Sequence, residues 1–116
     1  MKNLYEIPEE VSANATDEFL EALVCGESGV NVERIVSLGQ VTAEGQWYDQ
    51  DRDEWVVILQ GVAKVQYQDG LEVTLNEGEH LFLPSHVKHR VSYTSSPCIW
   101  LAVFGQALKL KCGVKK

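Results

Sequence analysis

The stretch Gly45–Gly61, GQWYDQDRDEWVVILQG, decides the fold of this chain. A glycine stands at each end, and an acidic segment leads directly into an apolar run, Trp55–Leu59. A short apolar run with a glycine just beyond it is typical of a buried β-strand. Side chains able to bind a ligand or a metal therefore lead straight into the interior of a small β-structure.

The segment that follows predicts a β-hairpin. Apolar and polar residues alternate on either side of Asp69–Gly70. A three-residue loop over 68–70 pairs Tyr67 with Leu71 and keeps apolar residues on one face, whereas a two-residue loop would pair Tyr67 with Glu72. We therefore expect the three-residue loop, with its glycine in the left-handed conformation.

Strand patterns dominate the chain from Val30 onward, with turn signals about every 8 to 12 residues. The segment Cys98–Phe104 is apolar at every position, which is typical of a strand covered on both faces. This pattern indicates an all-β sandwich or barrel.

The only helical pattern lies at about residues 15–25. A glycine at position 26 suits a C-terminal helix cap, and one helical face carries Phe19, Leu20, Leu23 and Val24. We expect one short N-terminal helix packed on the barrel. The single domain 1–116 is expected to divide into an N-terminal extension over 1–29, a barrel over 30–106 and a C-terminal tail over 107–116.

Composition and charge exclude several classes of partner. Hydrophobic residues make up 45% and charged residues 23% of the chain, which is typical of a globular domain. The net charge of −7 argues against nucleic acid and against anionic membrane surfaces, because both are negatively charged. With no apolar segment near the ~20 residues that span a bilayer and no signal-peptide pattern, we expect a cytoplasmic protein. Its separated cysteines are then reduced thiols: Cys25, Cys98 and Cys112.

Two polar residues share parity with apolar strand positions. His89 alternates with Val87 and Val91, so its imidazole should point inward and needs a hydrogen-bond partner or a metal. Taken alone, an inward histidine is more often a hydrogen-bonded core residue. Glu54 shares parity with Val56, but that strand is apolar on both sides, so its direction stays open. It is either a buried carboxylate that needs a partner or a carboxylate at the wet end of the strand.

Further candidates lie close to these two in the sequence. Tyr48 and Gln50 match the parity of Glu54 and could hydrogen-bond a small polar ligand. His86 stands three residues before His89 and could reach the same metal or face solvent. The residues expected to line a pocket are Tyr48, Val56 and Tyr93.

Two blocks of the sequence resemble the motifs of small single-domain cupins. In the first block Glu54 and Gly61 match the family spacing, and in the second Gly78, Pro84 and His89 match it. The resemblance implies a double-stranded β-helix, also called a jelly roll, that is often dimeric. It also implies a metal site inside the barrel.

The chain departs from the family motifs at the metal site. Tyr48 and Gln50 stand where the family has two histidines, and His86 stands where the second motif has a glycine. The ligands left for one divalent ion (Zn, Fe, Mn or Ni) are Glu54 and His89, with Gln50 or His86 as additions. This set is poor in imidazole for a site that usually has three firm protein ligands.

Three functions follow from these observations. The resemblance implies a metal-dependent enzyme of the dioxygenase or isomerase/epimerase type, with Glu54 and His89 as ligands. A second function is a non-catalytic cupin that binds or senses a small polar molecule in its barrel without a firm metal. A third is a dimeric structural or interaction module. We expect a homodimer, and the aromatic residues able to anchor its interface are Trp47, Trp55 and Trp100.

Overall fold

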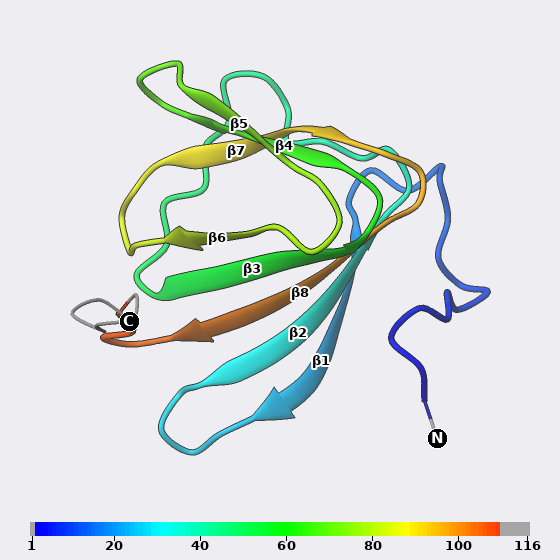
Figure 1. Ribbon diagram of the computed structural model, residues 1–116, viewed down its shortest axis with the longest axis horizontal. Helices are drawn as coiled ribbons and strands as arrows, with labels where there is room; N and C mark the ends of the chain where they lie inside the picture. Colours follow the sequence, from blue (N-terminus) through cyan, green and yellow to red (C-terminus); the bar gives the residue numbers. More distant parts are fainter. Residues whose placement is uncertain (1, 110–116) are drawn as a thin grey trace.

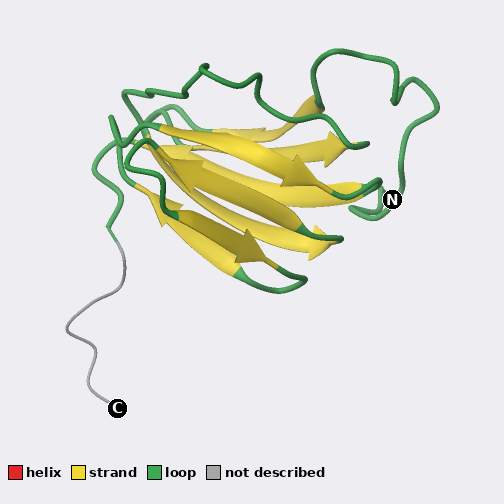
Figure 2. Cartoon of the chain, turned by 90° about the horizontal axis from the view of Figure 1, so that it is seen from above, coloured by secondary structure: helices red, strands yellow, loops and turns green. Residues whose placement is uncertain are grey.

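The protein folds into two antiparallel β-sheets that pack against each other (Figures 1 and 2). The computed structural model describes residues 2–109, and in this range the strands are joined by loops and turns. The larger sheet has the strand order β1-β2-β8-β3-β6, and the smaller sheet has the order β5-β4-β7. The strands are β1 (Phe19–Cys25), β2 (Asn31–Ser37), β3 (Asp53–Gln60), β4 (Ala63–Tyr67), β5 (Glu72–Leu75), β6 (His80–Leu83), β7 (His89–Thr94) and β8 (Cys98–Gly105).

From β3 onward the chain passes repeatedly between the two sheets. β4 and β5 belong to the smaller sheet, β6 returns to the larger one, β7 lies in the smaller one, and β8 inserts between β2 and β3. Figure 1 shows β4, β5 and β7 on one side of the molecule, opposite β3 and β8. Such double-sheet connections are those of a jelly roll, which confirms the expected all-β barrel.

The inward face of β3 fixes the direction of Glu54, which the sequence left open. Burial alternates along this strand, so that Glu54, Val56 and Ile58 are buried while their neighbours are only partly covered. Val56 and Ile58 belong to the hydrophobic core between the sheets. The core is completed by residues of both sheets, among them Ala63, Val65, Leu75, Leu83, Trp100 and Ala102.

The hairpin between β4 and β5 confirms the expected register. Val65 pairs with Val73, and the amide of Tyr67 donates to the carbonyl oxygen of Leu71 at 2.7 Å. Gly70 has a φ of 98°, which is the left-handed conformation that the loop requires. The three-residue loop keeps the apolar residues of both strands on the core face.

The helix expected over residues 15–25 is wrong, because Phe19–Cys25 forms β1. This strand pairs with β2, and Gly26 donates its amide to the Val30 carbonyl within the connecting turn at 2.7 Å instead of capping a helix. Leu20 and Val24 are 59% and 58% exposed, so the residues that suggested a helical face are not buried together. The helical pattern is weak, and the hydrogen bonds that this segment forms with the edge of β2 outweigh it. No helix of residues 2–109 is long and apolar enough to cross a membrane.

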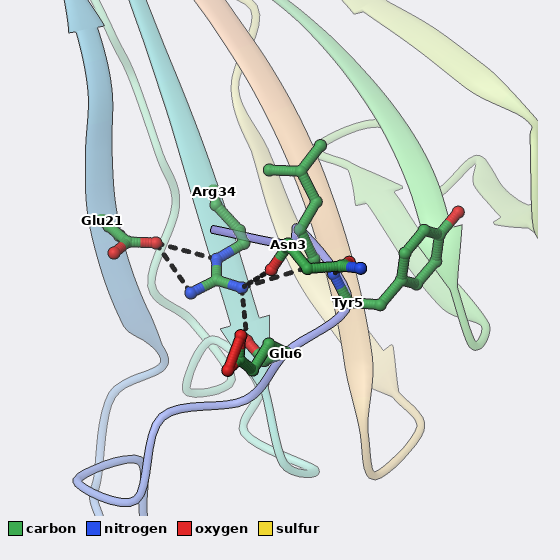
Figure 3. Close-up of polar contacts among 6 residues, drawn as sticks. Asn3, Tyr5, Glu6, Glu21 and Arg34 are labelled. Carbon is green, nitrogen blue, oxygen red and sulfur yellow. Dashed lines mark hydrogen bonds and ion pairs between the residues drawn. The ribbon is translucent and has the colours of Figure 1, made fainter. Parts of the chain in front are cut away.

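The segment before β1 is held by one buried cation, Arg34 on β2 (Figure 3). Its Nη1 donates to the carbonyl oxygens of Leu4 at 3.0 Å and Glu6 at 2.6 Å. Its Nε and Nη2 contact Glu21 Oε1 at 2.9 and 2.7 Å. The N-terminal segment is thereby tied to both β1 and β2.

The cysteines that the structure describes carry free thiols. Cys25 is exposed at the end of β1, and Cys98 is buried at the start of β8. Burial raises the pKa of the Cys98 thiol to about 12, so this group stays protonated at neutral pH. Cys112 and most of the expected tail over 107–116 lie outside the described residues.

Candidate functional site

A cavity of about 280 Å³ lies between the two sheets. Its apolar wall comes from both sheets and includes Ile35, Val56, Val65, Leu83, Trp100 and Phe104. Its polar groups come from the loop before β3, from three strands and from the segment before β1: Tyr48, Gln50 and Arg52; Glu33, Glu54 and His89; and Glu18. A mainly apolar wall with a few polar groups is typical of a small-molecule site.

Glu54 is a buried carboxyl group of this cavity, with 7% of the residue exposed. Gln50 donates from Nε2 to Glu54 Oε1 at 3.1 Å. Burial raises the pKa of the Glu54 carboxyl to about 7, and the nearby Glu33 and Glu18 carboxylates act in the same direction, whereas the Gln50 hydrogen bond opposes the shift. Near neutral pH the group is therefore poised to hold or release a proton.

His89 presents a hydrogen-bond acceptor to the cavity. Its Nδ1 lies 2.9 Å from the carbonyl oxygen of Val87. Because a carbonyl only accepts, Nδ1 must carry the proton, which leaves Nε2 as the acceptor of the neutral ring. Burial lowers the pKa of His89, which favours that neutral form.

Tyr48 is placed beside His89 by backbone pairing. The Tyr48 amide donates to the His89 carbonyl at 2.7 Å, and the His89 amide donates to the Tyr48 carbonyl at 3.2 Å. Their ring centroids lie 5.6 Å apart. Farther along the same pair of segments, the His86 amide donates to the Gln50 carbonyl at 2.7 Å. The loop before β3 thus runs along the edge of β7 and carries its side chains to the cavity.

The structure brings together most of the residues singled out from the sequence. The cavity is lined by Tyr48, Gln50, Glu54, Val56 and His89. Parity and motif spacing were sufficient to find this group. Two other candidates, His86 and Tyr93, lie elsewhere.

His86 points away from the cavity and into solvent. Its φ of 63° is left-handed, as expected for a position where the family motif has glycine. Its side chain is 68% exposed, and Nδ1 lies 2.9 Å from Asp49 Oδ1. His86 therefore joins neither Glu54 nor His89 as a ligand.

Tyr93 lies outside the cavity because a β-bulge reverses the parity of β7. Val65 pairs with Val91, but Lys64 pairs with Tyr93, so Ser92 is an extra residue between them. Tyr93 is 46% exposed, and Lys64 Nζ lies 5.9 Å from the centroid of its ring. The alternation that correctly places His89 and Val91 fails two residues later.

Sequence patterns did not identify three charged residues of the cavity as part of the site. Glu18 was read as part of a helix, and Glu33 and Arg52 follow no motif. For Glu33 a signal existed, because it shares parity with the apolar Ile35 on the same strand. Arg52 lies with its Cζ 4.6 Å from the centroid of the Phe104 ring, a cation–π contact between distant segments that spacing cannot reveal.

Trp100 is not an exposed interface anchor. It is only 4% exposed, lines the cavity, and donates from Nε1 to Ser37 Oγ at 3.2 Å. β8 is apolar at every position because it lies between β2 and β3 in the centre of the larger sheet.

The side chains at the cavity do not fit the metal that the resemblance implies. Within residues 2–109 no group of three His, Cys, Asp or Glu side chains is arranged to hold an ion. Glu54 and His89 have side chains that could bind a metal firmly, but Gln50 directs its amide nitrogen at Glu54 and His86 is outside. A catalytic site usually supplies three firm protein ligands, and Glu18 and Glu33, which also line the cavity, are not arranged to complete such a group with Glu54 and His89.

Comparisons with known proteins agree with this architecture. A solved structure from Ralstonia eutropha JMP134, provisionally named a mannose-6-phosphate isomerase, is 34% identical with a TM-score of 0.80. The alignment covers 92% of this chain and 98% of that one. A comparison with curated proteins finds no match.

Two more distant structures share the fold. A cupin superfamily protein from Desulfitobacterium hafniense DCB-2 is 18% identical with a TM-score of 0.68, over 90% of this chain and 99% of that one. An RmlC-like cupin from Desulfovibrio desulfuricans is 16% identical with a TM-score of 0.63, over 90% and 96%. The family described as "Cupin domain" matches residues 35–104, which is more than half of the chain. With its jelly-roll sheets and its inward Glu54 and His89, the chain belongs to the cupin family.

Proposed function

We propose that this cupin binds a small polar molecule in the cavity between its sheets and does so without a firmly held metal. One observation carries the proposal. Glu54 and His89 reach the same cavity, while His86, the histidine that could have completed a metal site, faces solvent. The cavity therefore has hydrogen-bonding groups, but in residues 2–109 no three of its acidic and histidine side chains are arranged to hold an ion.

The cavity is suited in size and surface to a small metabolite. Its volume of about 280 Å³ corresponds to roughly nine water molecules at ~30 Å³ each. Trp100 and Phe104 offer apolar surface to the carbon skeleton of a ligand, and Tyr48, Glu54 and His89 offer hydrogen bonds. Small-molecule sites commonly combine these two kinds of surface.

The metal-dependent enzyme is the alternative, of the dioxygenase or isomerase/epimerase type. The name of the Ralstonia protein suggests a sugar phosphate for that protein. In this chain a phosphate group would enter a cavity lined by Glu18, Glu33 and Glu54, with Arg52 as the only arginine or lysine among the lining residues. Like charges repel, so the cavity wall favours other ligands.

Metal content and ligand binding, measured on the same protein, test the proposal. Tag-free protein is equilibrated separately with Zn, Fe, Mn and Ni salts, desalted and analysed for bound metal. Binding of small polar compounds is then followed by amide NMR shifts before and after chelation. We expect far less than one ion per chain and shift changes around Glu54 and His89 that survive chelation.

A matched pair of variants makes this test decisive. His89→Ala removes a cavity imidazole, and His86→Ala removes an exposed one. One ion per chain that is lost in His89→Ala but kept in His86→Ala, together with binding that chelation abolishes, would overturn the proposal in favour of the metalloenzyme.

A homodimer remains a prediction of the sequence. β1 is an edge strand of the larger sheet and exposes Leu20 and Val24, and an open edge with apolar side chains is a feature that pairing can cover. Light scattering across a hundredfold range of concentration tests it. A constant mass of two chains supports the dimer, and a constant mass of one chain contradicts it.

A further inference from the structure

We propose that the cavity selects small organic cations, ligands that carry an ammonium or guanidinium group on a short carbon chain, over carboxylate and phosphate ligands. This inference rests on the proposed function, because it assigns the ligand class of the same cavity. It is carried by the charges, the hydrogen-bonding directions and the aromatic side chains of the cavity wall.

The charges of the cavity wall are unbalanced toward the negative. Glu18, Glu33 and Glu54 line it, against one cation, Arg52. Among residues 2–109 Arg34 forms an ion pair with Glu21, and the His86 ring contacts Asp49; all four residues lie outside the cavity lining. The cavity carboxyl groups thus have no ion-pair partner in the part of the chain that the structure describes. Even with Glu54 protonated, two carboxylates face one guanidinium.

Arg52 is held at the wall by other contacts. Its guanidinium packs over the ring of Phe104, with Cζ 4.6 Å from the centroid. With the amide of Asn31 in its favourable orientation, Arg52 Nη1 donates to the amide oxygen at 3.0 Å. An anion site would aim free donors at its ligand, and this guanidinium is already engaged in two contacts.

The donors of Gln50, His89 and Trp100 in the wall are also engaged, whereas the Tyr48 hydroxyl can donate or accept. Gln50 Nε2 donates to Glu54 at 3.1 Å. His89 Nδ1 lies 2.9 Å from the Val87 carbonyl oxygen, so Nε2 is left as an acceptor. An ammonium group brings three donors and no acceptor, and a guanidinium brings five donors and no acceptor. Such groups match this wall, whereas carboxylates and phosphates bring further acceptors.

Aromatic side chains extend the match beyond charge. Tyr48 and Trp100 both line the cavity, and Trp100 belongs to the hydrophobic core of the protein. The faces of such rings attract cations, most strongly where water is excluded. The packing of Arg52 on Phe104 is an example of this contact in the same cavity wall.

A series of matched probes tests the charge selection. Pentylammonium, 1-pentanol, pentanoate and pentyl phosphate share a carbon chain and differ in charge. Their affinities are measured by calorimetry and amide NMR shifts at pH 7.5, in low and in high salt. We expect pentylammonium to bind about tenfold more tightly than pentanol, the effect of one favourable charge contact in a partly buried site, and to weaken in high salt. Pentanoate and pentyl phosphate should bind more weakly than pentanol.

Substitutions of opposite sign locate the effect in the cavity. Glu33→Gln should weaken pentylammonium binding about fivefold, and Arg52→Gln should strengthen it by a similar factor, because each removes one charge from the wall. Glu77→Gln removes the same charge from an exposed turn outside the cavity and should leave the affinity unchanged. Pentanol binding should respond little to any of the three.

The outcomes separate this inference from the proposed function. Pentanoate or pentyl phosphate binding as tightly as pentylammonium would overturn the charge selection and leave a ligand-binding cavity. An affinity for pentylammonium that changes in neither Glu33→Gln nor Arg52→Gln would also overturn it, because the cation would then bind elsewhere. Shift changes at the cavity with none of the probes would overturn the charge selection, whereas the proposed function is overturned only by the stoichiometric, His89-dependent metal described above.

Discussion

Two ionisable side chains are buried on opposite faces of the larger sheet, and they differ in the number of polar groups that surround them. Arg34 on β2 is 5% exposed and faces the N-terminal segment, where it contacts Glu21 and several backbone carbonyl oxygens. Glu54 on β3 is 7% exposed and faces the cavity, where Gln50 is its hydrogen-bond partner. The two side chains are buried to a similar extent, but Arg34 has many more hydrogen-bond partners than Glu54 to offset the cost of removing it from water.

The difference separates a structural charge from one available to a ligand. A buried ion that is fully hydrogen-bonded recovers much of its desolvation cost, and its removal leaves its partners unpaired. A buried carboxyl with little compensation instead shifts its pKa, as Glu54 does. Arg34 therefore fixes the fold, and Glu54 retains hydrogen-bonding capacity that a ligand can use.

The largest effect is expected from the structural charge. Arg34→Met should lower the free energy of unfolding by about 3–5 kcal/mol, because it leaves the Glu21 carboxylate and the carbonyl oxygens of Leu4 and Glu6 without their donor. Urea denaturation measures the loss, and hydrogen exchange should show faster exchange in residues 3–8.

An exposed cation gives the control for this substitution. Lys88→Met removes the same charge from an exposed position of the chain and should change stability by less than about 0.5 kcal/mol. A loss below about 1 kcal/mol in Arg34→Met would mean that this guanidinium behaves like a surface ion, and the contrast with Glu54 would disappear.

A smaller, pH-dependent effect of opposite sign is expected at Glu54. Its pKa is raised from 4.5 to about 7 in the folded protein, so folding favours the protonated carboxyl. Its contribution to stability is complete below pH 4.5 and is lost as the pH rises through 7, by about 3 kcal/mol. Glu54→Gln should therefore be more stable than the wild type at pH 8, and the advantage should vanish by pH 4.5.

Denaturation curves of the two proteins from pH 4.5 to 8 measure this crossover. Glu77→Gln, which removes an exposed carboxylate, should run parallel to the wild type throughout. If Glu54→Gln ran parallel as well, Glu54 would be as well compensated as Arg34, and the cavity would have no carboxyl poised for a ligand.

His89 should show a weaker dependence on pH, in the opposite direction. Burial lowers the pKa of its imidazole below 6.5, so folding favours the neutral ring. The stability that it contributes is present above pH 6.5 and declines as the pH falls through the lowered value. The ring-proton NMR shift of His89 should titrate below pH 6.5. A titration above 6.5 would place a carboxylate, rather than the Val87 carbonyl, as the dominant partner of the ring.

Much of the fold was predictable because its signals are local. The alternation around Asp69–Gly70 gave the hairpin register, since a slip of one residue would turn every apolar side chain outward. The first motif singled out Tyr48, Gln50 and Glu54, and the structure brings all three to the cavity, although the direction of Glu54 was left open. Alternation along the sequence correctly predicts which face of the sheet a side chain lies on wherever the strand is regular.

The errors arise where the backbone is irregular or where distant segments decide. The bulge at Ser92 turns Tyr93 outward, and the left-handed backbone of His86 accompanies a ring that faces solvent. β1 was taken for a helix because pairing with β2 leaves no mark within its own sequence. Glu18 lies directly before β1 and lines the cavity, so the sequence could not assign its role either.

The smallest effect is expected at His86, a third polar side chain that is neither buried nor strongly paired. His86→Asn retains a residue that tolerates the left-handed backbone and removes only an exposed contact with Asp49. Stability should change by less than about 0.5 kcal/mol, and pentylammonium affinity and metal content should stay at the wild-type level. Denaturation, calorimetry and metal analysis of this one variant therefore probe the boundary of the site.

A loss of ligand or metal in His86→Asn would show that the rim closes over the cavity in solution. In that case the exposed fraction of a side chain in this structure would not tell the residues of the site from those of the surface. Glu54 would then have a further hydrogen-bond partner, and its compensation would be closer to that of Arg34.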